Sequence, residues 1–230
     1  MPDAAALTRA AIRARLDRPR VRRERGDVAT AMALFENGNL EPFAEAETGP
    51  VTSSGIPYQE GARIKRAPAA VLVPLIERRE GFSVLLTQRT PEMKRHAGQI
   101  AFPGGRMEPT DETPIECALR EAREETGLDP GKVEILGTLD AYLTITGYEV
   151  TPVVGAVTPP VDLAADPAEV AEIFEVPLGF FLDPGNHRRV ERFYKGARRA
   201  YYAMPYGERY IWGATAGMLL NFYELVRGEG

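Results

Sequence analysis

Residues 120–128, R-E-A-R-E-E-T-G-L, constrain the fold of this chain more than any other segment. On a helix, Glu121, Glu124 and Glu125 stand at positions i, i+3 and i+4, so their carboxylates share one face. Like charges at this spacing destabilise a helix by roughly 0.2–0.5 kcal/mol per pair. We therefore expect a positively charged partner at this face.

A divalent metal ion is the partner that this arrangement favours. Clustered carboxylate oxygens are hard ligands, which prefer Mg2+ or Mn2+ to zinc. The chain has one cysteine and two histidines, so no cluster of softer ligands competes. The alternative is a solvated acidic face in which Arg120 and Arg123 pair with the glutamates along the helix.

Local signals predict where this helix begins and ends. Thr113, Pro114 and Glu116 read as a capping box with proline at the first helical position. Gly127 stands where a C-cap belongs. Upstream, two glycines at 104–105 open a polar loop, where the missing side chains let the backbone approach a phosphate or a metal closely.

This loop and helix resemble the Nudix box, the signature of hydrolases that cleave nucleoside diphosphates linked to another group. The box is written G-x5-E-x7-R-E-U-x-E-E-x-G-U with U apolar, and its second half matches residues 120–128 at every specified position. One extra residue separates Gly105 from Glu112, so either Asp111 or Glu112 takes the place of the loop acid. The resemblance implies an α/β/α sandwich around a mixed β-sheet.

The resemblance also implies a Mg2+ or Mn2+ cofactor and a role for each box residue. Glu124 and Glu125 would bind the metal, and Glu121 would be a further ligand or a base. The backbone carbonyl of Gly104 would add another ligand. Arg120 would orient a glutamate through paired hydrogen bonds.

A second motif lies directly before the box. Residues 85–105, L-L-T-Q-R-T-P-E-M-K-R-H-A-G-Q-I-A-F-P-G-G, resemble the segment L-L-T-x-R-[SA]-x3-R-x3-G-x3-F-P-G-G of Nudix coenzyme A pyrophosphatases. The spacing is identical, and two positions depart, since Thr90 stands for Ser or Ala and Lys94 for Arg. A lysine cannot make the bidentate phosphate contact of an arginine. Similarity to bacterial members continues at residues 146–155, 169–178 and 212–218.

This resemblance predicts hydrolysis of coenzyme A or acyl-CoA to 3',5'-ADP and 4'-phosphopantetheine or its acyl derivative. Because coenzyme A carries an additional 3'-phosphate, extra cations are expected near the box. The substrate-binding candidates are Arg89, Lys94, Arg95, Gly104, Gly105 and Arg106. A solvated basic loop is the competing interpretation for these cations. Alternative substrates are ADP-ribose, dinucleoside polyphosphates and oxidised nucleotides.

A general base from outside the box is common in the Nudix superfamily. Glu169 and Glu172 are both candidates in this chain, and Glu172 joins Glu121, Glu124 and Arg120 in the predicted catalytic set. The competing interpretation is that both are surface glutamates on a short helical turn.

The N-terminus has a charge distribution of its own. Residues 1–25 hold eight arginines against three acids, a local charge of +5 in a chain of net charge −5. A transit peptide or a nucleic-acid arm would explain it, and the second makes a nucleic-acid-binding regulator an alternative function. We favour an amphipathic helix with Ala10, Ile12 and Leu16 on its apolar side and arginines facing solvent.

The chain is expected to form one large domain with an extension. Residues 1–66 are predicted to be an Arg-rich helical extension and linker, and residues 67–230 the Nudix domain with its box at 104–128. No apolar run approaches the roughly 18 residues needed to span a membrane. The single Cys117 cannot form an intrachain disulfide, which fits a reducing cytoplasm. The expected partner is a small-molecule substrate, and binding of nucleic acid is unlikely. The resemblance also predicts that the chain forms a homodimer.

Hydrophobic periodicity gives a coarse set of elements. Paired strands are expected at 69–76 and 82–89, and a short third strand at 99–102. Further strands are expected at 133–143, 149–157 and 192–204, and a closing helix at 213–226.

Overall fold

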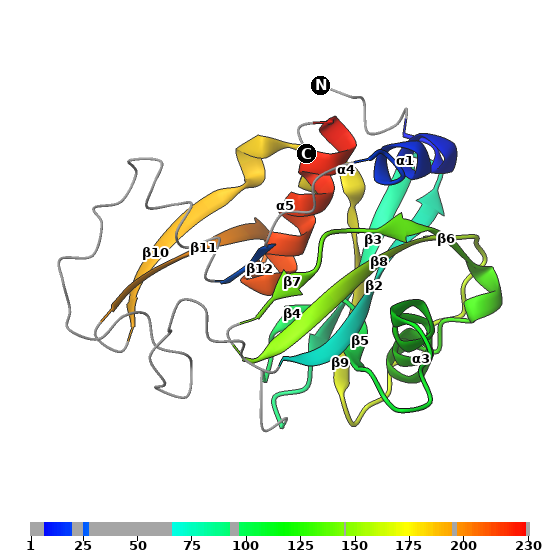
Figure 1. Cartoon of the computed structure of the whole chain (residues 1–230), viewed down its shortest axis with the longest axis horizontal. Coiled ribbons are helices and arrows are strands. Elements are labelled where there is room, and N and C mark those ends of the chain that lie inside the picture. Colours follow the sequence, from blue (N-terminus) through cyan, green and yellow to red (C-terminus); the bar gives the residue numbers. More distant parts are fainter. Residues whose placement is uncertain are drawn as a thin grey trace.

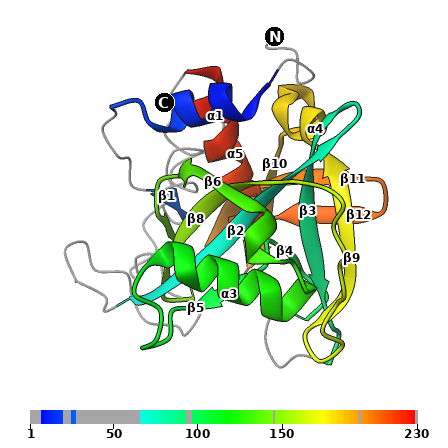
Figure 2. The same cartoon turned by 90° about the vertical axis from the view of Figure 1, so that its right-hand side faces the viewer.

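The computed structural model describes residues 7–19, 25–27, 66–92, 97–144, 146–194 and 197–228, with the backbone alone described between 192 and 199. A twisted sheet lies at the centre, with helices on both of its faces (Figures 1 and 2). Among the described residues the sheet has nine strands, and a separate three-stranded sheet lies beside it.

Three long strands form the middle of the sheet. β2 (Ala67–Arg78) runs antiparallel to β3 (Gly81–Arg89) and parallel to β8 (Tyr148–Val157). The sheet is therefore mixed, as predicted. Its shorter strands are β1 (Arg25–Gly26), β4 (Ile100–Ala101), β5 (Gly104–Arg106), β6 (Val133–Thr138), β7 (Tyr142–Leu143) and β9 (Val170–Pro177).

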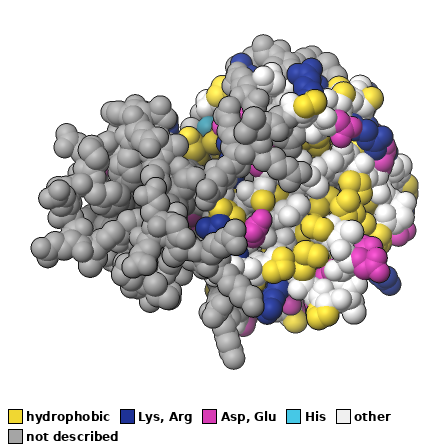
Figure 3. All heavy atoms as spheres, viewed as in Figure 1, with side chains coloured by type: hydrophobic (Ala, Val, Ile, Leu, Met, Phe, Trp, Pro, Cys, Tyr) yellow, Lys and Arg dark blue, Asp and Glu magenta, His cyan; other side chains and the backbone are white. Residues whose placement is uncertain are grey.

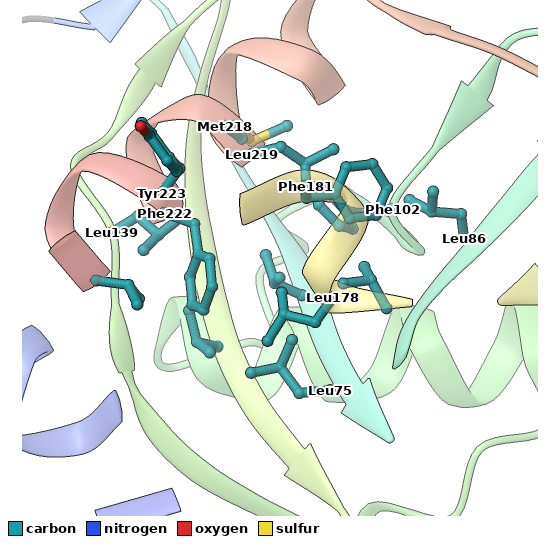
Figure 4. Close-up of a cluster of buried hydrophobic side chains, with 14 of the residues drawn as sticks. Leu75, Leu86, Phe102, Leu139, Leu178, Phe181, Met218, Leu219, Phe222 and Tyr223 are labelled. Carbon is teal, nitrogen blue, oxygen red and sulfur yellow. The ribbon is translucent and has the colours of Figure 1, made fainter. Parts of the chain in front are cut away.

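Alternating side chains of β2 build two cores. Leu72 and Ile76 pack toward α3 (Pro114–Thr126), together with Cys117 and Ala118 of that helix. Leu75 and its neighbours on the opposite face pack with α4 (Leu178–Leu182) and α5 (Ala214–Arg227), as Figure 4 shows. Since both faces of the sheet are covered by helices, the predicted α/β/α sandwich is confirmed.

The predicted ends of the box helix are confirmed. Thr113 accepts a hydrogen bond from the backbone N–H of Glu116 at 3.2 Å, and the Glu116 carboxylate accepts one from the N–H of Thr113 at 3.2 Å. Gly127 closes the helix in the left-handed conformation with φ 68°. The paired strands β2 and β3, the short β4 and the closing α5 also lie where the sequence placed them.

Three of the predicted elements differ from the structure. The strand expected at 133–143 is two strands, β6 and β7, which pair separately with β8. The single strand expected at 192–204 is two strands, β10 (Arg188–Tyr194) and β11 (Ala197–Tyr206), which pair antiparallel and are joined by β12 (Arg209–Trp212). The helical turn considered for Glu169 and Glu172 holds only for Glu169, in a single turn closed by a hydrogen bond from the N–H of Val170 to the carbonyl of Asp166 at 2.8 Å. Glu169 ends a turn, and Glu172 lies in β9, which pairs with β3.

The N-terminal helix α1 (Arg9–Leu16) packs onto the domain. Ile12 and Leu16 are buried as predicted, and each contributes roughly 1.5–3 kcal/mol by leaving water. Ala10 is exposed, which corrects its predicted place on the apolar side. Arg9 does not simply face solvent, because its guanidinium pairs with Glu77 and Glu134, each at 2.7 Å.

Other arginines of the N-terminal segment also pair with acids of the domain. Arg13 contacts Glu134 at 2.7 Å, and Arg25 contacts Glu224 at 2.6 Å. Acidic and basic side chains are interspersed on the face shown in Figure 3. Charges neutralised in this way favour an intramolecular role for these arginines over a nucleic-acid arm. The predicted linker lies almost wholly outside the described residues, and the proposed division at residue 66 stays a prediction.

No helix in the described part of the chain is long and apolar enough to cross a membrane.

Candidate active site

Helix α3 and strand β5 bring the box glutamates against the two glycines. A Cβ atom on Gly105 would lie 2.5 Å from Oε1 of Glu121, so only glycine leaves room for that carboxylate. A Cβ on Gly104 would lie 2.5 Å from the carbonyl oxygen of Ala70 and 2.6 Å from Cα of Val71, the partner of Gly104 in the β2–β5 pairing. Both glycines are therefore required by close approach, one to the carboxylate and one to the sheet.

Glu125 is the most deeply buried glutamate of the box helix, with 4% of its surface exposed. Its Oε2 accepts a hydrogen bond from the backbone N–H of Gly104 at 3.3 Å. Burial raises the pKa of Glu125 to about 7, against the opposing charge of Arg89. Burial also raises the pKa of Glu121, and the charge of Arg120 opposes this increase. The site thus holds carboxylates that gain from a further positive charge.

Arg120 connects the box loop to the glutamates of the helix. Its Nε and Nη2 donate to Oδ1 and Oδ2 of Asp111 at 3.0 and 2.8 Å. Its Nη1 donates to Glu121 at 3.0 Å and to Glu124 at 2.9 Å. The hydrogen bonds from Arg120 lower the pKa of Asp111 to about 2, so the pair is ionised at neutral pH. Arg120 thus contacts two glutamates by single hydrogen bonds, whereas its paired hydrogen bonds go to Asp111, and its role as the residue that orients a glutamate stays a prediction.

The contacts of Arg120 distinguish the two candidates for the loop acid. The side chain of Asp111 is 4% exposed and faces Arg120. Glu112 is exposed, and its backbone N–H donates to Glu116 at 2.7 Å. Asp111 thus occupies the position of the loop acid in space, although Glu112 keeps the seven-residue spacing to Arg120.

Arg89 of β3 links the box to the residues before β9. Its Nη1 lies 3.5 Å from Oε1 of Glu125, and its Nη2 lies 3.3 Å from Oε2 of Glu169. Glu172 instead pairs with Arg209 of β12, and the Arg209 guanidinium lies 4.3 Å from the ring centre of Phe174. Of the two candidate bases, the structure brings Glu169 to the box carboxylates.

Comparison with known proteins identifies the family. The NUDIX domain family model matches residues 65–194. The chain belongs to the Nudix hydrolase family. It is 39% identical to the Nudix hydrolase NudL of Citrobacter koseri over 163 residues, which make up 71% of this chain and 84% of that relative. NudL of Escherichia coli K12 is 40% identical over 151 residues, 66% of this chain and 78% of the relative.

A solved structure gives a weaker likeness. The Nudix hydrolase RenU of M. smegmatis has a TM-score of 0.44 and 24% identity, over 58% of this chain and 81% of its own.

Nudix hydrolases use divalent metal ions, generally Mg2+ or Mn2+. Among the described residues, no three acidic, histidine or cysteine side chains are grouped closely enough to hold such an ion in this conformation. Arg120 and Arg89 form ion pairs with these carboxylates. The charge of the site nevertheless fits a cation, because five carboxylates surround two guanidiniums and, when all five are ionised, leave an excess of three negative charges. The five are Asp111, Glu121, Glu124, Glu125 and Glu169.

Only one of the three remaining cations predicted to bind the substrate lies among the described residues. Arg106 is exposed on β5, and its carbonyl accepts a hydrogen bond from Nη2 of Arg120 at 3.4 Å. Lys94 and Arg95 lie outside the described residues. Arg209 was missed by the sequence analysis, because no local signal links it to Glu172, which is 37 residues away.

Proposed function

We propose that this Nudix hydrolase cleaves the pyrophosphate bond of coenzyme A or acyl-CoA. The products would be 3',5'-ADP and 4'-phosphopantetheine or its acyl derivative. One observation supports the proposal: the described ends of the segment that resembles coenzyme A pyrophosphatases lie against the box glutamates. Its Arg89 pairs with Glu125 of the box, and its last two glycines adjoin Glu121 and Glu125.

The residues that would hold the metal are Glu121, Glu124, Glu125 and the carbonyl of Gly104. A bound Mg2+ or Mn2+ supplies charge neutralisation at the pyrophosphate and acidifies a water molecule. The chain itself supplies orientation. Arg120, fixed by Asp111, holds Glu121 and Glu124 through hydrogen bonds of 3.0 and 2.9 Å.

We propose Glu169 as the general base in place of Glu172. Its carboxylate reaches Arg89 beside Glu125, and its charge contributes to raising the pKa of both Glu121 and Glu125. A base must lie within hydrogen-bond reach of the water that it deprotonates, and Glu169 is the candidate closest to the metal-binding carboxylates. Glu172 is engaged by Arg209, which favours a structural role for that pair.

Cations near the box would bind the phosphates of the substrate. Arg106 lies on β5 next to the two glycines, and Arg89 lies at the end of β3. Both strands pair with β2. Lys94 and Arg95 belong to the same sequence segment and complete the proposed set for the 3'-phosphate. Gly104 and Gly105 would let the pyrophosphate approach the backbone.

A substrate panel tests this function. Coenzyme A, acetyl-CoA, ADP-ribose and dinucleoside polyphosphates are incubated with the protein and Mg2+ or Mn2+, and the products are identified by mass spectrometry. The proposal expects 3',5'-ADP and 4'-phosphopantetheine at the highest kcat/KM. Negligible cleavage of coenzyme A with rapid cleavage of ADP-ribose would transfer the proposal to the alternative substrate class. Glu124→Gln should abolish turnover on every substrate while the protein remains folded.

The expected assembly and location belong to the same proposal. A homodimer would appear in size-exclusion chromatography with light scattering at twice the mass of 25.3 kDa. A cytoplasmic location fits the single cysteine, which is buried and free. Fractionation of cells would test the location directly.

A further inference from the structure

The sequence contains the pair Asp-Pro three times, at 129–130, 166–167 and 183–184. In each place the side chain of the aspartate accepts a hydrogen bond from the backbone N–H two residues later, at 2.9, 2.9 and 2.8 Å. Aspartate stabilises a turn through this bond, and proline through its fixed φ. Because the three turns share one local construction, they differ mainly in what surrounds them.

The turn at 166–170 fixes the backbone of Glu169. The carbonyl of Asp166 accepts a hydrogen bond from the N–H of Glu169 at 3.1 Å and another from the N–H of Val170 at 2.8 Å. The side chain of Asp166 accepts from the N–H of Ala168 at 2.9 Å. One aspartate therefore binds three successive N–H groups, and that of Glu169 is the middle one.

This turn is attached to two elements that carry residues of the site. The N–H of Asp166 donates to the carbonyl of Glu125, near the end of α3, at 3.0 Å. The N–H of Thr90, directly after β3, donates to the carbonyl of Glu169 at 2.9 Å. Since the last carbonyls of a helix have no partner within the helix, the bond from Asp166 also satisfies one of them. The turn thus connects the end of the box helix to the end of β3.

We propose that Asp166 is a positioning residue, which keeps Glu169 beside the box carboxylates by fixing the turn at 166–170 on the end of α3. This role rests on the proposed function of Glu169 as the general base. The side chain of Glu169 is 48% exposed, so beyond its ion pair with Arg89 its place depends on the backbone that carries it. A displacement of about 1 Å at a reacting group can lower a rate roughly 100-fold. Neither of the other two Asp-Pro turns carries a predicted site residue.

A double-mutant cycle tests whether Asp166 acts through Glu169. The full-length protein is assayed with Mg2+ or Mn2+ on the substrate that the panel ranks highest. Asp166→Ala removes the side-chain acceptor and should lower kcat roughly tenfold. In Glu169→Gln the base is already lost, so adding Asp166→Ala should cause no further loss of kcat. Losses that multiply in the double variant, or a wild-type kcat of Asp166→Ala, would overturn the proposal.

Two further variants separate the hydrogen bond from charge and from stability. Asp166→Asn keeps an acceptor oxygen at the same place and should retain kcat within about twofold. A loss equal to that of Asp166→Ala would overturn the role of the hydrogen bond. Asp183→Ala makes the same change in a turn of the same construction after α4, and should lower Tm to a similar extent with kcat unchanged. An equal loss of kcat there would attribute the effect to stability and overturn the specific role of Asp166.

Pro167→Gly covers the case in which Asp166→Ala does not fold. Pro167 is exposed, and glycine there loosens the turn by removing the restriction on φ while Asp166 stays in place. We expect kcat to fall about threefold in the wild type and not at all in Glu169→Gln, with Pro184→Gly as the matched control. An unchanged kcat in the wild type, or an equal loss in Glu169→Gln, would overturn the proposal.

The same cycle distinguishes failure of the positioning role from failure of the proposed function. If Glu169→Gln alone is as active as the wild type, Glu169 is not the base, and the positioning role is overturned together with that assignment. If Glu169→Gln is impaired and the losses multiply, only the role of Asp166 is overturned. The comparison holds on any substrate that the enzyme cleaves, so it does not depend on coenzyme A.

Discussion

Asp111 and Arg120 form a bidentate ion pair with oxygen–nitrogen distances of 3.0 and 2.8 Å. The pair connects the loop after β5 to the middle of α3. Because two parallel hydrogen bonds fix the plane of a guanidinium, Asp111 determines where the remaining donor of Arg120 points. That donor, Nη1, reaches both Glu121 and Glu124. An acid in the loop is thus connected through Arg120 to two carboxylates of the site.

We expect Asp111→Asn to lower kcat by roughly 10–100-fold, the usual effect of losing a group that orients a metal-site residue. Asparagine retains one acceptor, so Arg120 would be held by a single contact and could rotate. Glu112→Gln is the matched control, since Glu112 is exposed and should tolerate the change. Steady-state kinetics on the best substrate and the Tm are measured for both variants. An equal loss of kcat in both would contradict the special position of Asp111.

Gly105→Ala should lower kcat by roughly 100-fold with a smaller effect on Tm. The added Cβ would lie 2.5 Å from the Glu121 carboxylate, so that side chain must move. Gly131→Ala is a suitable control, because its nearest atom is an Asp129 side-chain oxygen at 3.2 Å on an exposed turn. Wild-type turnover by Gly105→Ala would mean that the position of Glu121 does not matter for catalysis.

Glu169→Gln should lower kcat by roughly 100-fold or more and flatten the acidic limb of its pH profile, as loss of a general base does. Glu172→Gln should stay within a few-fold of the wild type, because Glu172 pairs with Arg209 on the other side of β9. Stopped-time assays of both variants across the pH range would show which of the two glutamates is the general base. The opposite order of effects would assign the base to Glu172.

Where the sequence carried local chemical signals, it predicted the structure well. The capping box at Thr113 and the C-cap at Gly127 fixed the box helix, because both depend on residues within one turn. The choice between Asp111 and Glu112 could not be made in this way. Asp111 fits the spacing from Gly105, and Glu112 fits the spacing to Arg120. Only the contact of Asp111 with Arg120 in the folded protein distinguishes them.

Long-range pairing explains the other differences. The partner of Glu172 is 37 residues away, and Arg89 meets Glu169 across 80 residues. Strand β9 did carry a period-two signal, with Val170, Phe174 and Val176 buried, but the glutamates spaced by three resembled a helical turn. The break between β10 and β11 had only Gly196 as its turn signal within a run of strand-forming residues.

Arg9→Gln should lower Tm by roughly 3 °C at neutral pH and have little effect in acid. Hydrogen bonds from Arg9 hold the pKa of Glu77 and of Glu134 below their ordinary value of 4.5. A pKa that is depressed in the folded state adds stability above the unfolded pKa, and this stability is lost as the pH falls through the folded pKa. Calorimetric Tm values of both proteins from neutral to strongly acidic pH would therefore converge at the acidic end.

The neighbouring Arg79→Gln serves as the control for this comparison, since Arg79 is exposed at the turn between β2 and β3. It should leave Tm unchanged at every pH. A loss of Tm in Arg9→Gln that persists unchanged in acid would instead arise from packing of the arginine stem beside Ile12. The pH-dependent result would mean that charge complementarity holds α1 on the domain, and that the positive charge of the N-terminal helix acts within the molecule.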